Sequence, residues 1–188
     1  SGFSTNKIIG MAGILDSSRF KYFLSQEMKV PVKNIEALVL GGHGDTMVPM
    51  TSFTTVNGKS LKQLLAENKI TKETLDAIID RTRNGGGEIG KLLQKASAYY
   101  APATSGIEMA ESYIKNLKKT LPCAAYLNGE YGVKNLYVGV PVVIGDKGVE
   151  KIVEIDLNVE EKKNFEVSIV AVKELFKAAV KIDPSLGK

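Results

Sequence analysis

The sequence of 188 residues contains only one cysteine, Cys123, and one histidine, His43. A single cysteine cannot form a disulfide within the chain, and this usage fits a reducing compartment better than a secreted one. The sequence also lacks a run of about 18 apolar residues, which a membrane-spanning helix needs, and a signal-peptide pattern at its N-terminus. We therefore expect a cytoplasmic protein that is neither secreted nor embedded in a membrane.

The sequence has no block of basic residues. The 25 Lys and Arg residues outnumber the 21 Asp and Glu residues, giving a net charge of +4, but they are scattered along the chain. A nucleic-acid partner is therefore not expected, because such proteins cluster their positive charge. A mildly basic surface is equally compatible with the attraction of a small anionic substrate.

Length and composition fit one globular domain. Hydrophobic residues make up 44% of the chain and charged residues 24%, which is ordinary for a globular protein. A chain of this length can enclose one sizeable core and is short for two. We expect residues 1–188 to form a single domain.

The spacing of apolar residues and of turn signals predicts the elements. Helices are predicted over 15–28, 60–68, 71–83, 89–98 and 104–119, and after Asn158. Extended segments are predicted over 35–40 and 52–57, and short antiparallel strands over 123–156. Asn158 is the expected N-cap of the last helix because Glu161 follows three residues later. Pro102 is expected to separate two of the central helices.

Residues 85–91, GGGEIGK, formally match the glycine pattern of a dinucleotide-binding loop and nearly match a phosphate loop. A dinucleotide loop needs a strand before it, whereas a predicted helix precedes this segment. A phosphate loop also needs a hydroxyl group for magnesium, and the residue in that place is Leu92. We therefore interpret the glycines as a break between two helices, and the sequence predicts no nucleotide site of its own.

His43 is the first candidate for chemistry. It follows the predicted strand over 35–40, and glycines on both sides would let a substrate approach the imidazole ring. Such a histidine can accept and donate a proton near neutral pH. A turn histidine that bonds only to the neighbouring backbone is an equally good interpretation of this motif alone.

Asp16 and Arg19 are the other candidates, three residues apart on one side of the first predicted helix. A carboxylate can orient an imidazole, and a guanidinium can hold a substrate carboxylate through two parallel bonds. From the residues alone, an N-cap for Asp16 and a surface ion pair for Arg19 are the better interpretation. The sequence pattern does not by itself bring either side chain to His43.

Four motifs together carry more information than any of them alone: LDSSRF at 15–20, GGHGDTMVP at 41–49, RTRNGG at 81–86 and SAYYAPA at 97–103. In composition and order they resemble the lactate/malate dehydrogenase family, and the resemblance runs over residues 1–188. It implies that Asp16 and His43 form the proton-transfer pair and that Arg19 binds the substrate carboxylate. We expect the three side chains to share one concavity, with an Asp16–His43 hydrogen bond.

The resemblance also implies an α+β fold, the C-terminal substrate domain of the family, with helices packed on a mostly antiparallel sheet. Family members bind NAD mainly on an N-terminal Rossmann domain, and residues 1–188 contain no usable fingerprint for it. The expected partners are that domain and further copies of the chain, since relatives are dimers or tetramers. No residue here is assigned to the cofactor or to a metal, and the chain alone is expected to be inactive.

Malate and oxaloacetate are the expected substrates, rather than lactate. Gly42 stands where lactate enzymes usually carry Glu, and Thr46-Met47 follows the malate pattern. Two alternatives remain open: a domain for lactate or another 2-hydroxy acid, and a standalone binding or oligomerisation module in which His43 is idle. The first predicted helix carries an apolar stripe of Phe20, Phe23, Leu24 and Met28. This stripe is the favoured surface for self-association, although the core of the domain could equally bury it.

Overall fold

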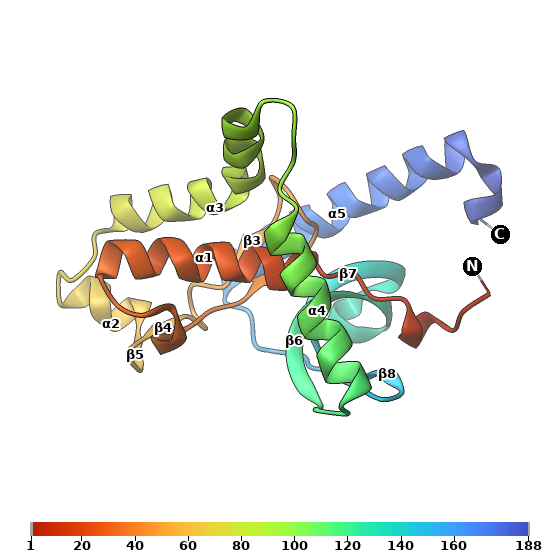
Figure 1. Cartoon of the computed structure of the whole chain (residues 1–188), viewed down its shortest axis with the longest axis horizontal. Coiled ribbons are helices and arrows are strands. Elements are labelled where there is room, and N and C mark those ends of the chain that lie inside the picture. The colour runs from red at the N-terminus through yellow and green to blue at the C-terminus, as the bar shows by residue number, and fades with distance from the viewer. Residues whose placement is uncertain (1, 188) are drawn as a thin grey trace.

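The structure, a computed structural model, describes residues 2–187 and combines helices with antiparallel sheets (Figure 1). The α-helices in this range are α1 (Ala12–Met28), α2 (Leu61–Ala66), α3 (Lys72–Leu93), α4 (Tyr100–Ile114) and α5 (Val159–Ile182). Short 3-10 helices occur at η1 (Thr5–Lys7), η2 (Val32–Asn34), η3 (Glu130–Gly132) and η4 (Pro184–Gly187). Within residues 2–187, no helix has both the length and the apolar composition needed to cross a membrane.

The strands of residues 2–187 form three sheets in which every pairing is antiparallel. They are β1 (Ile35–Glu36) with β4 (Thr55–Val56) and β5 (Lys59–Ser60), β2 (Val39–Leu40) with β3 (Val48–Pro49), and β6 (Lys119–Asn128) with β7 (Lys134–Gly145) and β8 (Gly148–Ile152). The expected α+β fold, with helices packed on antiparallel sheet, is confirmed. The antiparallel strands predicted over 123–156 are β6, β7 and β8.

Helix α1 lies between two hydrophobic cores. Ile14, near its start, belongs to a core formed mainly by the β6–β7 hairpin, which also contains Phe165 of α5. Phe20 and Leu24, farther along, pack in a second core with residues of α2 and α3. Full burial of such side chains contributes about 1.5–3 kcal/mol each. The position of α1 is therefore fixed from both sides, and Asp16 lies at the junction.

The apolar stripe of α1 is used inside the chain. Phe20 and Leu24 are completely buried, and Phe23 and Met28 pack partly buried against the same core. Of the two roles left open for this stripe, the structure shows the internal one. Phe20 and Leu24 are therefore not available as a surface for self-association, and self-association itself stays a prediction.

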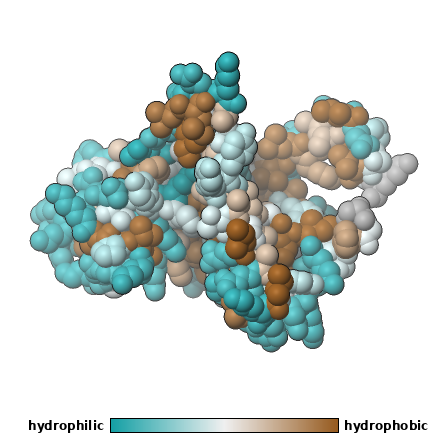
Figure 2. Space-filling model, in the orientation of Figure 1, coloured by the Kyte–Doolittle hydropathy of each residue, from teal (hydrophilic) through white to brown (hydrophobic). Residues whose placement is uncertain are grey.

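Helix α5 begins in the core and ends outside it. The predicted N-cap is confirmed, because Asn158 and Glu161 form reciprocal capping bonds. Phe165 is buried, but Leu175 and Ile182 are 70% and 86% exposed. Figure 1 shows the outer half of α5 extending away from the sheets, and Figure 2 shows hydrophobic residues there and at the far end of α3.

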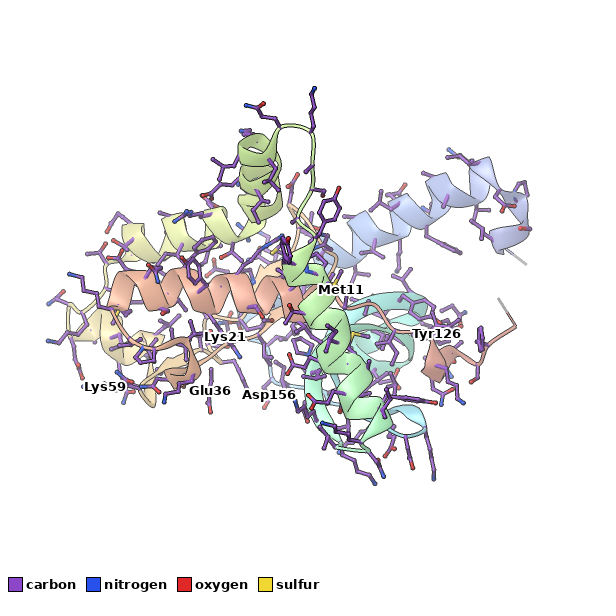
Figure 3. All side chains as sticks on the ribbon, viewed as in Figure 1. Met11, Lys21, Glu36, Lys59, Tyr126 and Asp156 are labelled. Carbon is purple, nitrogen blue, oxygen red and sulfur yellow. The ribbon has the colours of Figure 1, made fainter. Side chains whose placement is uncertain are left out.

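Figure 3 draws the side chains on the ribbon, with the charged residues Lys21, Glu36, Lys59 and Asp156 among those labelled. Lys59 lies near the left edge of this view, and Glu36 and Asp156 lie along its lower edge. Lys59 pairs with the exposed Glu67, a kind of surface contact that contributes little to stability.

The segment predicted as one strand over 35–40 is divided between two sheets. β1 pairs with β4, whereas β2 pairs with β3. Alternate residues face the two cores, Ile35 and Val39 the second and Leu40 the first. The side chains of this segment alternate between the two cores, as expected for a strand. Which strands it pairs with depends on the rest of the fold.

The helices in the middle of the chain also differ from the prediction. α3 continues through Gly85, Gly86 and Gly87 to Leu93, so these glycines do not end it. Figure 1 shows that α3 changes direction in its second half, as helices often do at glycines. Pro102 lies in the first turn of α4 and bends no helix, because the first turn has no backbone acceptor for the missing N–H.

Candidate active site

His43 lies in the loop that joins β2 to β3. Pairing of Leu40 with Val48 closes the loop at its base. Gly41 exchanges two backbone hydrogen bonds with Gly139 of β7, with N···O distances of 2.8 and 3.0 Å. A Cβ atom on Gly139 would lie 2.4 Å from the Gly41 carbonyl oxygen, so this close approach requires glycine. The loop is therefore attached directly to the large sheet.

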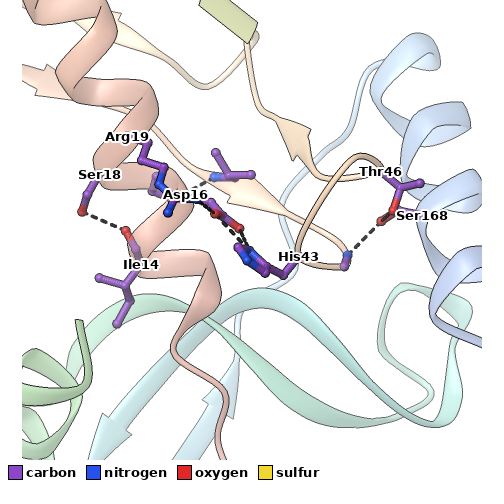
Figure 4. Close-up of polar contacts among 10 residues, drawn as sticks. Ile14, Asp16, Ser18, Arg19, His43, Thr46 and Ser168 are labelled. Carbon is purple, nitrogen blue, oxygen red and sulfur yellow. Dashed lines mark hydrogen bonds and ion pairs between the residues drawn. The ribbon is translucent and has the colours of Figure 1, made fainter. Parts of the chain in front are cut away.

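Asp16 of α1 holds the imidazole of His43. Nδ1 lies 2.8 Å from Oδ2 of Asp16 and 3.1 Å from Oδ1, and the Asp16 side chain is only 3% exposed (Figure 4). Because a carboxylate can only accept, Nδ1 carries a proton and donates it. The imidazole is half exposed, and Nε2 has no hydrogen-bond partner in residues 2–187. The predicted hydrogen bond is confirmed.

Asp16 raises the pKa of His43 above its ordinary value of 6.5. The largest cause is the hydrogen bond to the carboxylate, and the negative charge of Asp16 adds to it. Partial burial of the ring and the cation of Arg19 both act in the opposite direction. The net effect favours the imidazolium form, which helps a histidine that must take up a proton.

This raised pKa links the stability of the chain to pH. His43 binds its proton more tightly in the folded than in the unfolded state. Its contribution should be complete below the unfolded pKa of about 6.5 and should be lost as the pH rises through the folded pKa. Urea unfolding from about pH 5 to about pH 9 measures it as the free-energy difference between the native chain and His43→Asn. A difference that stays constant over this range would contradict the linkage.

Arg19 lies one helical turn from Asp16. Its Nη1 is 3.5 Å from Oδ1 of Asp16, and its side chain is 11% exposed. Its Nε is buried and has no hydrogen-bond partner in the described part of the chain. A guanidinium with unused donors in a mostly dry site can bind a carboxylate through two parallel bonds.

Gly85 and Gly86 of α3 leave room for the Arg19 side chain. A Cβ atom on Gly85 would lie 3.1 Å from Cδ of Arg19, and one on Gly86 would lie 3.7 Å from both terminal nitrogens. The first distance is shorter than an ordinary van der Waals contact. The absence of a side chain at Gly85 therefore allows α3 to pass close over Arg19. The sequence interpretation missed this role, because no local pattern shows which side chain lies beneath a glycine.

Arg19 borders a cavity of about 320 Å³ between α1, α3 and α4, together with Leu15 and Ile89. Neither His43 nor Asp16 borders this cavity. Figure 4 shows Asp16 between the guanidinium and the imidazole. Asp16 thus contacts both Arg19 and His43. That the three side chains open into one concavity stays a prediction.

The strand pairing of residues 2–187 does not fit a dinucleotide site of the Rossmann type. Such a site needs parallel strands joined through a glycine turn to a helix, and every pairing here is antiparallel. The glycine pattern at 85–90 lies inside α3, where backbone amides bond within the helix. These residues by themselves therefore do not form the Rossmann type of NAD site.

Comparisons of the sequence and of the structure with known proteins give the same family. Residues 14–182 match the family model described as lactate/malate dehydrogenase, alpha/beta C-terminal domain. Over all 188 residues the chain is 64% identical to a malate dehydrogenase of Pelagibacter ubique (strain HTCC1062), of which it covers 59%.

Two solved structures show the same similarity. A malate dehydrogenase of Cryptosporidium parvum is 45% identical with a TM-score of 0.92, the match covering 94% of this chain and 56% of that one. A lactate dehydrogenase of the same organism, complexed with lactic acid and nicotinamide adenine dinucleotide, is 44% identical with a TM-score of 0.93, covering 95% and 56%. The chain thus spans somewhat more than half the length of the relatives it matches.

Proposed function

The chain belongs to the lactate/malate dehydrogenase family, and on that premise we propose that residues 1–188 are the substrate domain of an NAD-dependent malate dehydrogenase. The observation that carries the proposal is the buried carboxylate of Asp16, 2.8 Å from Nδ1 of His43 and 3.5 Å from Arg19. The motif residues come together although the chain separates Asp16 and His43 by 27 positions.

In the proposed reaction, His43 moves the proton. Because Nδ1 donates to Asp16, neutral His43 presents Nε2 as an acceptor on the exposed side of the ring. Nε2 takes the proton of the 2-hydroxyl group when malate is oxidised and returns it when oxaloacetate is reduced. Asp16 stabilises the imidazolium that forms between these steps, in agreement with the raised pKa of His43.

Arg19 fixes the substrate in the proposed site. Its two terminal nitrogens can donate in parallel to the carboxylate next to the reacting carbon. Two bonds to a planar carboxylate define its orientation as well as its position. Packing of Gly85 over the side chain limits the rotation of the guanidinium.

We assign the binding of NAD to an N-terminal Rossmann domain outside residues 1–188, which would be a partner of this domain. One relative of known structure carries nicotinamide adenine dinucleotide together with lactic acid, which supports this cofactor. When bound, the cofactor would accept the hydride from malate, while the residues described here hold the substrate and move its proton.

The proposal favours malate over lactate because of the 64% identity to a malate dehydrogenase. The solved structures do not separate the substrates, since a malate and a lactate enzyme match almost equally well. We further propose a cytoplasmic homo-oligomer, supported by the single cysteine and by the exposed apolar side chains of α5, including Leu175 and Ile182.

The 188-residue chain alone should not oxidise malate or lactate with NAD. Alignment of reactants supplies about 7–11 kcal/mol of a typical barrier, and these residues provide only the substrate side of it. The test measures NADH formation by the chain alone and by the chain joined to the N-terminal domain of the Pelagibacter relative. The joined protein should turn over malate faster than lactate. Turnover by the chain alone, with host enzymes removed, would place a cofactor site within residues 1–188. It would refute the assignment of NAD binding to a separate N-terminal domain.

A further inference from the structure

The loop that carries His43 is also held from the side opposite Asp16, by Ser168 of α5. The Ser168 side chain is completely buried. Its hydroxyl accepts a hydrogen bond from the backbone N–H of Gly42 at 2.8 Å and donates to Oγ1 of Thr46 at 3.3 Å. Gly42 directly precedes His43 and Thr46 follows it, so one hydroxyl joins the two sides of the loop.

The backbone of the loop packs directly on α5. A Cβ atom on Gly41 would lie 2.4 Å from Oγ of Ser168, and one on Gly42 would lie 2.7 Å from Cγ2 of Val172. Gly41 also has a φ of +85°, which favours glycine. These two glycines of the motif therefore serve the contact with α5 as well as access to the imidazole.

The part of α5 that carries Ser168 is itself firmly placed. Phe165 and Ile169, one on each side of Ser168, are 2% and 8% exposed in the core. At the start of the helix, the buried Glu161 accepts hydrogen bonds from the backbone N–H and the hydroxyl of Ser52, at 2.9 and 2.7 Å. Ser168 thus connects the loop that carries His43 to a buried part of α5.

We propose that Ser168 is a positioning residue, whose hydroxyl fixes the loop so that the imidazole of His43 stays in hydrogen-bond contact with Asp16. Figure 4 shows the geometry, with α1 and Asp16 on one side of the loop and α5 with Ser168 on the other. Because Ser168 is completely buried, it acts on the loop through its hydrogen bonds with Gly42 and Thr46. This inference rests on the proposed proton-transfer role of His43.

The test compares Ser168→Ala with a matched control, Ser112→Ala. Ser112 is also completely buried, donates to the carbonyl of Ile144 and accepts from the N–H of Lys119, but it lies on α4 away from the loop. Both variants lose one buried hydroxyl with two bonds. Similar losses of stability are expected from both, so stability alone does not distinguish them.

Two measurements on the 188-residue chain separate positioning from stability. The chain has one histidine, so its NMR titration reports His43 alone. In Ser168→Ala, the pKa of His43 should fall toward 6.5 and the Gly42 amide should exchange with solvent roughly 10-fold faster, since its acceptor is gone. Ser112→Ala should leave both unchanged. Native values of both in Ser168→Ala would overturn the proposal.

Thr46→Val provides a second variant that keeps the bond from Gly42. It removes only the longer contact of Ser168, so Gly42 exchange should rise about twofold, with a small fall in the pKa of His43. If Ser168→Ala does not fold, Thr46→Val tests the proposal in its place. Native values of the Gly42 exchange rate and of the pKa of His43 in Thr46→Val would then refute the positioning role.

Kinetics of the intact enzyme complete the test. Ser168→Ala should lower kcat about 10-fold with little change in KM, because a displaced proton acceptor affects the reaction more than binding. His43→Asn is measured in parallel. If His43→Asn retains turnover, the proposed function fails whatever Ser168 does. If His43→Asn is inactive and Ser168→Ala matches Ser112→Ala in kcat and in the pKa of His43, the positioning role is refuted.

Discussion

His43→Asn should lower kcat for malate oxidation by the intact enzyme about 100- to 10,000-fold, the usual contribution of a positioned general acid–base group. The asparagine amide can still donate to Asp16, so the buried carboxylate keeps a partner and the fold should be retained. KM for malate should change by no more than about threefold, because Arg19 remains in place. The limb of the pH–rate profile that reports deprotonation of the base should disappear.

The control for this variant is Lys59→Gln, which removes an exposed ion pair with Glu67 at the far end of the molecule. Its kcat should equal that of the native enzyme. Stopped-flow and steady-state assays of NADH formation give kcat for both variants, and thermal unfolding checks that both are folded. A folded His43→Asn enzyme with kcat within about threefold of native would exclude His43 as the proton acceptor.

Arg19→Leu should lower kcat/KM for malate about 150- to 25,000-fold, because two charge-assisted hydrogen bonds of about 1.5–3 kcal/mol each are lost. Arg19→Lys should be intermediate, at about 100-fold, since an ammonium keeps the charge but not the parallel pair of bonds. The pKa of His43 should rise in Arg19→Leu, because the arginine cation lowers it in the native chain.

A substrate analogue provides the control for Arg19. An amide in place of the carboxylate next to the hydroxyl should already react slowly with the native enzyme, and Arg19→Leu should slow it little further. Equal losses of kcat/KM for malate and for the amide would show that Arg19 acts on the fold or on Asp16 rather than on the carboxylate.

Local patterns predicted elements whose residues lie close together in the chain. The capping box of Asn158 and Glu161 starts α5, and period-two alternation marks β7, because both depend on neighbours within a few residues. The same reasoning failed where packing outweighs propensity. Gly85 costs α3 about 1 kcal/mol in helix propensity, yet the helix continues because α3 packs over Arg19 at this point.

The sequence alone determined the residue types available for the chemistry and, through the order of four motifs, the family to which they belong. It could not show that Asp16 stands between Arg19 and His43, because that arrangement depends on how α1 crosses the β2–β3 loop. The contact of Gly42 with Ser168 joins positions 126 residues apart. No local sequence pattern predicts such contacts, because they form only when the two cores place α1 and α5 on opposite sides of the β2–β3 loop.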